Sequence, residues 1–151
     1  DDLDRAGYHE DRALALNPND DLIVVQQGEI LTWLGKPEEG IDWIKKAMRL
    51  NPYHPERYWN HLGRSYFVAR RYREAIEAFQ RISAPDHLVF ANLAACHAMT
   101  DDSVVAKECV QEVLRRQPDF AVESFRTSLH YRNDADLEHH RQALLKAGLP
   151  A

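Results

Sequence analysis

The sequence has little of what marks a secreted, membrane-spanning or nucleic-acid-binding protein. It has two cysteines, Cys96 and Cys109, without a CxxC spacing, so we expect no disulfide scaffold and predict reduced thiols in a cytoplasmic protein. Its longest apolar runs, such as residues 22–25, are far too short to span a bilayer, and we expect no membrane contact. The net charge of −5 argues against nucleic acid as the partner.

The sequence also lacks the motifs of common enzyme chemistry. It has no glycine-rich phosphate loop, no GxSxG and no HExxH, and no pair of titratable groups is placed for acid–base catalysis. Eight histidines suggest a metal hypothesis, and their densest stretch is Glu138-His139-His140. Adjacent residues on a helix point about 100° apart, which fits a solvated surface better than one metal ion. We therefore expect no enzyme activity, cofactor or metal in this chain.

The composition is that of a folded domain. Of the 151 residues, 44% are hydrophobic and 28% are charged, which is typical of a globular protein about one domain long. The chain opens at Asp1 without a methionine, and we expect it to be a fragment of a longer protein.

A short motif that ends in proline recurs along the chain. Leu-Asn-Pro ends at Pro18 and again at Pro52, and the related Arg-Gln-Pro ends at Pro118. The first two prolines are 34 residues apart and the last two are 66 apart, close to two such units. Because proline blocks helix continuation and restricts the residue before it, each motif should end a helix. A period of this length indicates a helical repeat.

The clearest repeat unit lies at residues 55–85. Its first half has apolar and small residues at helical spacing, namely Trp59, Leu62, Gly63 and Tyr66. After a tight turn a second stripe follows, formed by Tyr72, Ala75, Ile76, Phe79 and Ile82. Two helices that meet through these stripes form an αα-hairpin. A lone hairpin would leave half of its apolar surface in water, so we expect neighbouring hairpins to stack on it.

The flanking segments repeat this pattern. The upstream stripes are Val24, Gln27, Gly28 and Leu31, followed by Gly40, Ile44 and Ala47. The downstream stripes are Phe90, Leu93, Ala94 and His97, followed by Ala106, Val110 and Val113. The pattern therefore predicts three consecutive hairpins.

These residues resemble the tetratricopeptide repeat (TPR) pattern over roughly residues 3–118. The match is nearly full in the central unit, at Trp59, Leu62, Gly63, Tyr66, Ala75 and Phe79. Gln27, Gly40 and His97 depart from the pattern, which affects local packing angles. The resemblance implies an all-α fold, a right-handed superhelix of antiparallel helix hairpins with about three repeats and a C-terminal helical cap.

We interpret residues 1–151 as a single TPR domain. Its expected parts are the second helix of a truncated repeat at 1–18, repeats at 21–52, 55–85 and 87–118, and a C-terminal helical cap at 119–150. Glu10 occupies an otherwise apolar position, so the first helix should be loosely packed.

The cap has its own expected structure. Residues 119–129 are expected to continue as a helix, and a last helix should begin after Asn133 and stop at Gly148. This last helix carries "DADLE" and "LLKAGLP", and it is similar to the tails of TPR regions that end many bacterial class III adenylate or guanylate cyclases and related winged-helix regulators.

In TPR arrays, the side of each first helix that faces away from its hairpin partner lines a concave groove, and we predict that this groove binds a partner. The candidate residues are Val25, Glu29, Trp33, Arg57, Asn60, Arg64, Val68, Ala91, Ala95 and Met99. Trp33 is either an anchor for the partner or a cover for the neighbouring hairpin. Arg57 and Arg64 could hold an acidic side chain. Val25 and Glu29 replace the Lys/Asn clamp of some TPR domains, so a terminal carboxylate is not expected here.

The sequence thus predicts a non-catalytic module for protein–protein interaction and scaffolding. Its partner would be a protein or peptide segment, such as another domain of the same chain, and the cyclase resemblance suggests regulation of an attached adenylate or guanylate cyclase. The alternatives are a small-molecule-sensing regulatory domain, the TPR region of a winged-helix transcription regulator, and an RNA-binding helical repeat, which the acidic balance disfavours.

Overall fold

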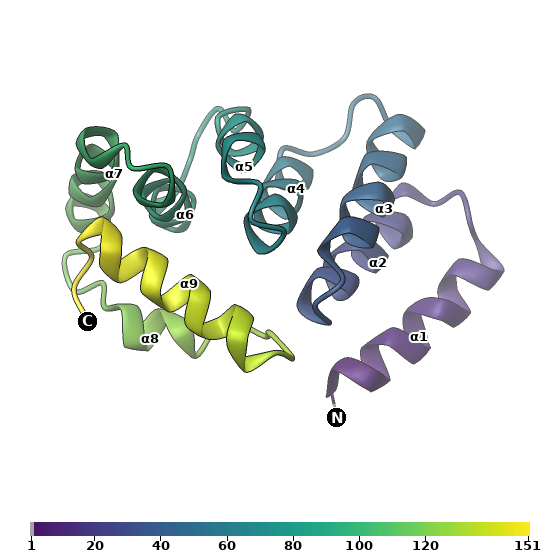
Figure 1. The fold of residues 1–151 in the computed structure, drawn as a ribbon. Helices are drawn as coiled ribbons and strands as arrows, with labels where there is room; N and C mark the ends of the chain where they lie inside the picture. Colours follow the sequence, from purple (N-terminus) through teal and green to yellow (C-terminus); the bar gives the residue numbers. More distant parts are fainter. Residues whose placement is uncertain (1) are drawn as a thin grey trace.

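The structure, a computed structural model, describes residues 2–151, and within them the chain forms nine α-helices and no β-strand. The helices are α1 (Asp2–Leu16), α2 (Asp21–Trp33), α3 (Pro37–Leu50), α4 (Arg57–Val68), α5 (Tyr72–Phe79), α6 (His87–Met99), α7 (Ser103–Arg116), α8 (Val122–Arg126) and α9 (Asp134–Ala147). Helices α1 to α7 stand in a row, and α9 crosses it (Figure 1). The predicted all-α fold of stacked helix hairpins is confirmed. Asp1, where the expected segment 1–18 begins, lies outside the described residues.

Three antiparallel hairpins, α2–α3, α4–α5 and α6–α7, form most of the row. In the first hairpin the two backbones touch, because a Cβ added to Gly28 would lie 2.8 Å from the carbonyl oxygen of Gly40. In the second, a Cβ on Gly63 would lie 2.6 Å from Cε1 of Phe79. Glycine at these positions therefore sets the distance between the helices.

The three hairpin turns share one backbone conformation. Each has a residue in the left-handed region, with φ of +79° at Gly35, 65° at Arg70 and 60° at Asp101. Only glycine adopts this region without a steric cost, so the turn geometry rather than the residue type is what repeats. The internal repeat is therefore visible in the backbone as well as in the apolar stripes.

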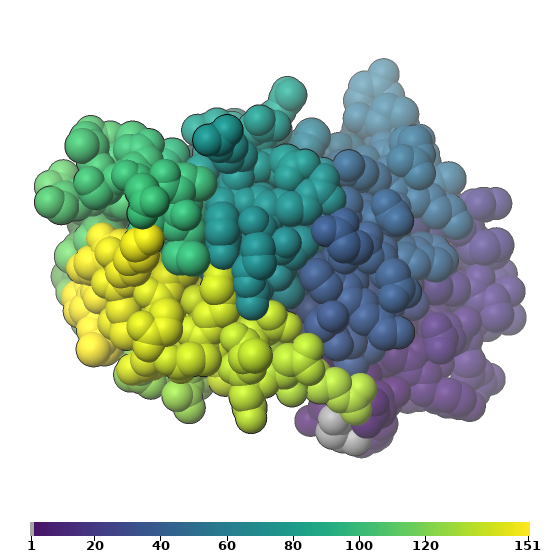
Figure 2. Space-filling model, viewed as in Figure 1, coloured from purple at the N-terminus to yellow at the C-terminus, as the bar shows by residue number. Residues whose placement is uncertain are grey.

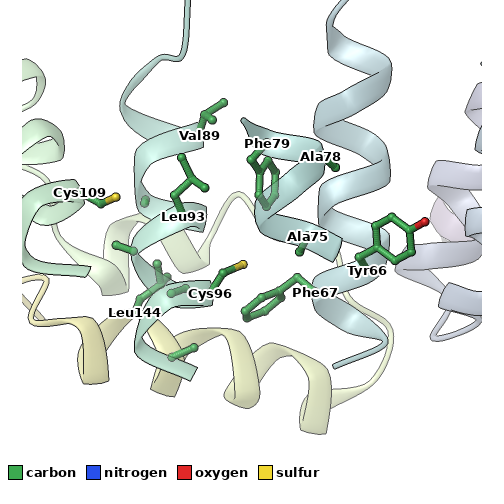
Figure 3. Close-up of a cluster of buried hydrophobic side chains, with 14 of the residues drawn as sticks. Tyr66, Phe67, Ala75, Ala78, Phe79, Val89, Leu93, Cys96, Cys109 and Leu144 are labelled. Carbon is green, nitrogen blue, oxygen red and sulfur yellow. The ribbon is translucent and has the colours of Figure 1, made fainter. Parts of the chain in front are cut away.

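The core is continuous from one hairpin to the next. Figure 3 shows Phe79 on α5 beside Val89 and Leu93 on α6, and Phe67 on α4 directed toward α9. Cys96 and Cys109 are both buried free thiols on the α6–α7 hairpin, and burial raises the pKa of both. They act here as small core side chains.

The segment after the third hairpin differs from the expectation of a helix over 119–129. Only Val122–Arg126, the short α8, is helical. The hydroxyl groups of Thr127 and Ser128 donate to the carbonyl oxygens of Ser124 and Phe125, both at 2.7 Å, and the chain leaves the helix in tight turns. Side-chain hydrogen bonds of this kind compete with helix continuation.

The C-terminal segment, residues 127–150, returns along the edge of the row where the hairpin turns lie (Figures 1 and 2). Its contacts reach all three turns. Asn133 lies against Gly35, Asp136 accepts a hydrogen bond from Arg70 at 3.0 Å, and Lys146 donates to Asp101 at 3.1 Å. Helix α9 packs mainly on α6. One helix thus connects the three repeats, and Gly148, with φ of 103°, ends it as predicted.

His140 on α9 is buried, with 1% of its surface exposed, so the prediction of a solvated Glu138-His139-His140 surface is wrong at this residue. Its Nε2 shares a hydrogen bond of 3.1 Å with Oδ1 of Asn92, and its Nδ1 shares one of 2.9 Å with the hydroxyl of Tyr131. The sequence pattern missed this burial because both partners come from other elements. The neighbouring His139 is half-buried and bonds the hydroxyl of Tyr72 at 2.8 Å.

Both histidines are held neutral. Burial, together with the charge of Arg64, lowers the pKa of His140 to about 3, and burial with Arg70 lowers that of His139 to about 4. An unfolded chain takes up these protons near the ordinary value of 6.5. The packing of α9 therefore depends on pH.

We expect Gly63→Leu to lower the free energy of unfolding by about 1–3 kcal/mol, because the new side chain meets the buried Phe79 ring. Gly7→Leu on α1 is the control, since a Cβ there has no atom within 4 Å among the described residues, and leucine favours a helix over glycine. Chemical denaturation of the parent and both variants provides the measurement. Equal stability of Gly63→Leu and the parent would show that the α4–α5 contact is not close.

We expect the stability of the parent to fall as the pH drops from 6.5 toward 4, because the unfolded chain binds protons that the folded chain excludes from His140 and His139. The full contribution of the two neutral histidines to the free energy of unfolding is present above pH 6.5. Below pH 6.5, the free energy of unfolding falls by up to about 1.4 kcal/mol per pH unit for each histidine. His140→Gln should lose less stability over this range than the parent. His9→Gln, on an exposed histidine, should behave as the parent does. Identical pH profiles for the parent and His140→Gln would contradict this.

Candidate functional site

The predicted groove residues lie along the first helices of the hairpins, but most have little free surface. The buried ones are Val25, Trp33, Val68, Ala91 and Ala95. The half-buried ones are Glu29, Asn60, Arg64 and Met99. Arg57 is exposed. This row of predicted groove residues, called the groove stripe below, therefore has little exposed surface over much of its length.

Trp33, the predicted anchor, is covered by the C-terminal segment. Its ring lies 4.8 Å from that of Tyr131 and 5.7 Å from that of His130, measured between centroids. The backbone N–H of Arg132 donates to the Trp33 carbonyl oxygen at 2.9 Å. Neither expectation, anchor or cover for a neighbouring hairpin, included this contact, because residues 130–132 are distant in sequence. Only 7% of Trp33 remains exposed.

The two arginines among the predicted groove residues, Arg57 and Arg64, have different partners. Arg64 donates to Oε1 of Glu29 at 3.2 Å, and its guanidinium lies 4.7 Å from the centroid of the Trp33 ring. Arg57 instead lies over the ring of Tyr58, at 5.7 Å. Arg64 is thus already paired within the chain, and the structure does not bring the two arginines to a shared partner.

Glu29 is ionised at the centre of this cluster. Burial acts against its charge, but Nδ1 of His61 at 3.3 Å and Arg64 outweigh burial and lower the pKa of Glu29 to about 2. The Glu29 carboxylate, the Arg64 guanidinium and the Trp33 ring therefore form one connected unit between α2 and α4.

A hollow of about 450 Å³ lies between α1 and α2 beside this unit. Its walls include Leu3, Ala6 and Glu10 from α1 and Glu29, Ile30 and Trp33 from α2. His130 of the C-terminal segment also lines it. Two of the predicted groove residues, Glu29 and Trp33, thus remain beside an open space. The volume is within the usual range for small-molecule pockets.

Glu10 also lines this hollow, a place that its position in the sequence did not indicate. Glu10 has 9% of its surface exposed, and its Oε1 is buried and accepts no hydrogen bond from residues 2–151. Burial, with a smaller contribution from Asp11, raises its pKa above the ordinary value. A carboxyl group in an apolar position of a helix was the signal in the sequence.

Two further properties of the described residues bear on the class of site. Among residues 2–151, no group of three or more His, Cys, Asp or Glu side chains is placed to hold a metal ion. Over the same range, no helix has the length and hydropathy needed to cross a bilayer.

Comparison with known proteins gives similarity in sequence and in fold. No family model matches the sequence. The chain is 31% identical over 70 residues to small glutamine-rich tetratricopeptide repeat-containing protein 2 of Mycosarcoma maydis, and 28% identical over 114 residues to tetratricopeptide repeat protein 13 of Homo sapiens. These stretches cover 46% and 72% of the chain. They span 20% and 13% of the lengths of the two relatives.

The structure is similar to solved structures of MamA over nearly its whole length. One crystal structure of MamA superposes with a TM-score of 0.69 at 20% identity, covering 97% of this chain and 86% of that one. MamA 41-end from Desulfovibrio magneticus RS-1 gives 0.70 at 16% identity, covering 95% and 85%. At such identity the likeness concerns the fold. The likeness shows that the chain is a solenoid of stacked helix hairpins, and the similarity to the two tetratricopeptide repeat proteins agrees with the repeat pattern in the sequence.

Proposed function

We propose that the chain is a non-catalytic protein-interaction module whose partner segment docks in the hollow between α1 and α2. The observation that carries this proposal is the place of Trp33 and Glu29, two residues of the predicted stripe that line an open space. The TPR-type fold and the TPR relatives support an interaction role.

The C-terminal segment covers one part of the groove stripe and leaves another part beside the hollow. Over α6 the stripe is buried at Ala91 and Ala95, and α9 packs on that helix. On α2 the stripe borders the hollow instead. A partner that docks here would place apolar side chains against Ile30, Leu3 and the part of Trp33 that lines the hollow.

Regulation of an attached cyclase or of a winged-helix regulator is a finer proposal that rests on the resemblance of "DADLE" and "LLKAGLP". In this chain those residues belong to α9 and its cap, where Ala143 and Leu144 are buried and Asp136 and Lys146 contact hairpin turns. Their pattern is therefore explained by the packing of α9. The proposed module does not depend on a cyclase partner.

A peptide selected from a random display library on the 151-residue chain should lose affinity when the hollow is truncated. Removing a buried anchor costs about 2–4 kcal/mol, so Ile30→Ala and Trp33→Ala should bind about 30- to 1000-fold more weakly than the parent. Calorimetric titration gives the dissociation constants, and a thermal melt checks that each variant folds. Small organic molecules that saturate the same site more tightly than any peptide would favour the sensor alternative.

Met48→Ala is the matched control, since Met48 is half-buried on α3 and lines a separate hollow of about 240 Å³ with Trp59 and Tyr66. Its affinity for the selected peptide should equal that of the parent. If the peptides bind Ile30→Ala as tightly as the parent and lose affinity for Met48→Ala, the partner site lies at this other hollow and the proposal is wrong.

A further inference from the structure

We propose that the hollow between α1 and α2 receives a basic side chain, lysine or arginine, from the partner segment, and that the carboxylate of Glu10 pairs with its charged end. This inference rests on the proposed function and specifies the chemistry of the partner. It assigns Glu10 a role in binding.

The first observation is that Glu10 lacks a compensating partner. Its side chain lines the hollow, and its Oε1 is shielded from water without accepting a hydrogen bond from residues 2–151. A buried carboxylate without a partner is costly, and the elevated pKa of Glu10 reflects that cost. A cation placed in the hollow would remove it.

The second observation is the charge of the walls. The side chains lining the hollow within residues 2–151 include two carboxylates, Glu10 and Glu29, and two imidazoles, His9 and His130, but no lysine or arginine. Arg64 lies behind Glu29 and is paired with it. The space is therefore acidic on its α1 side, and an incoming acidic side chain would meet a like charge.

The third observation is the apolar part of the walls. Leu3, Ala6 and Ile30 lie in the same hollow as Glu10, so the aliphatic stem of a lysine or arginine can pack on them while its charged end reaches the carboxylate. A purely apolar side chain would bury Glu10 further without pairing it. A basic side chain can pack its stem on the apolar residues of the hollow and pair its charged end with the Glu10 carboxylate.

The test uses two small probes of nearly equal shape, n-butylguanidinium, which is charged, and n-butylurea, which is neutral. With the ¹⁵N-labelled 151-residue chain at constant ionic strength, n-butylguanidinium should produce saturable NMR shifts of α1 and α2 amides and of the Trp33 indole. Binding in roughly the millimolar range is expected for probes of this size. n-Butylurea should bind about tenfold more weakly or not at all.

Glu10→Gln keeps the shape of the side chain and removes the charge. It should abolish the preference for n-butylguanidinium, and it should melt at a higher temperature than the parent at pH 7 without any probe, because an unpaired buried charge is gone. Glu108→Gln, on an exposed residue of α7, is the control and should bind as the parent does.

Equal binding of the two probes, or an unchanged preference in Glu10→Gln, would overturn the inference. A different result distinguishes failure of this inference from failure of the proposed function. If a selected peptide loses affinity in Ile30→Ala but keeps it when each of its lysines and arginines is replaced by methionine, the hollow is a docking site without a basic-residue preference, and only this inference fails.

Discussion

The packing of α9 across the hairpin turns is the constraint on which the rest of the structure depends. A TPR-type array is held mainly by contacts between neighbouring hairpins, so distant repeats are normally independent. Here one helix contacts the turn of each hairpin, and His140 ties it to Asn92 on α6 and to Tyr131 in the preceding loop. Since both ring nitrogens are used in a buried site, the position of α9 is specified by hydrogen bonds as well as by apolar contact.

This packing makes the inner side of the array unequal along its length. Near α6 the groove stripe is covered by α9. Near α2 it borders the hollow shared with α1. The residues that precede α9 also hold Trp33, so the C-terminal segment shapes the wall of the proposed site. A change in how α9 packs would alter the site as well as the stability of the fold.

The two carboxylates at the hollow illustrate opposite electrostatic situations. Glu29 is half-buried but ionised, because His61 and Arg64 outweigh the partial loss of water. Glu10 is buried without such partners among the described residues, and its pKa moves upward. Pairing within the chain makes Glu29 part of the scaffold. Because Glu10 has no such partner among the described residues, a cationic group of a binding partner would form the ion pair that Glu10 lacks.

The sequence by itself determined the hairpins and their number, because helical periodicity, small residues such as Gly28 and Gly63 and the recurring prolines are local signals. It also indicated Glu10 as an anomaly and predicted the end of α9 at Gly148. Only the tertiary structure decided which part of the stripe stays open, since that depends on where residues 127–150 return. The contacts of His140 with Asn92 and of Trp33 with Tyr131 join residues about 50 to 100 positions apart in sequence, and no local pattern encodes contacts at that separation.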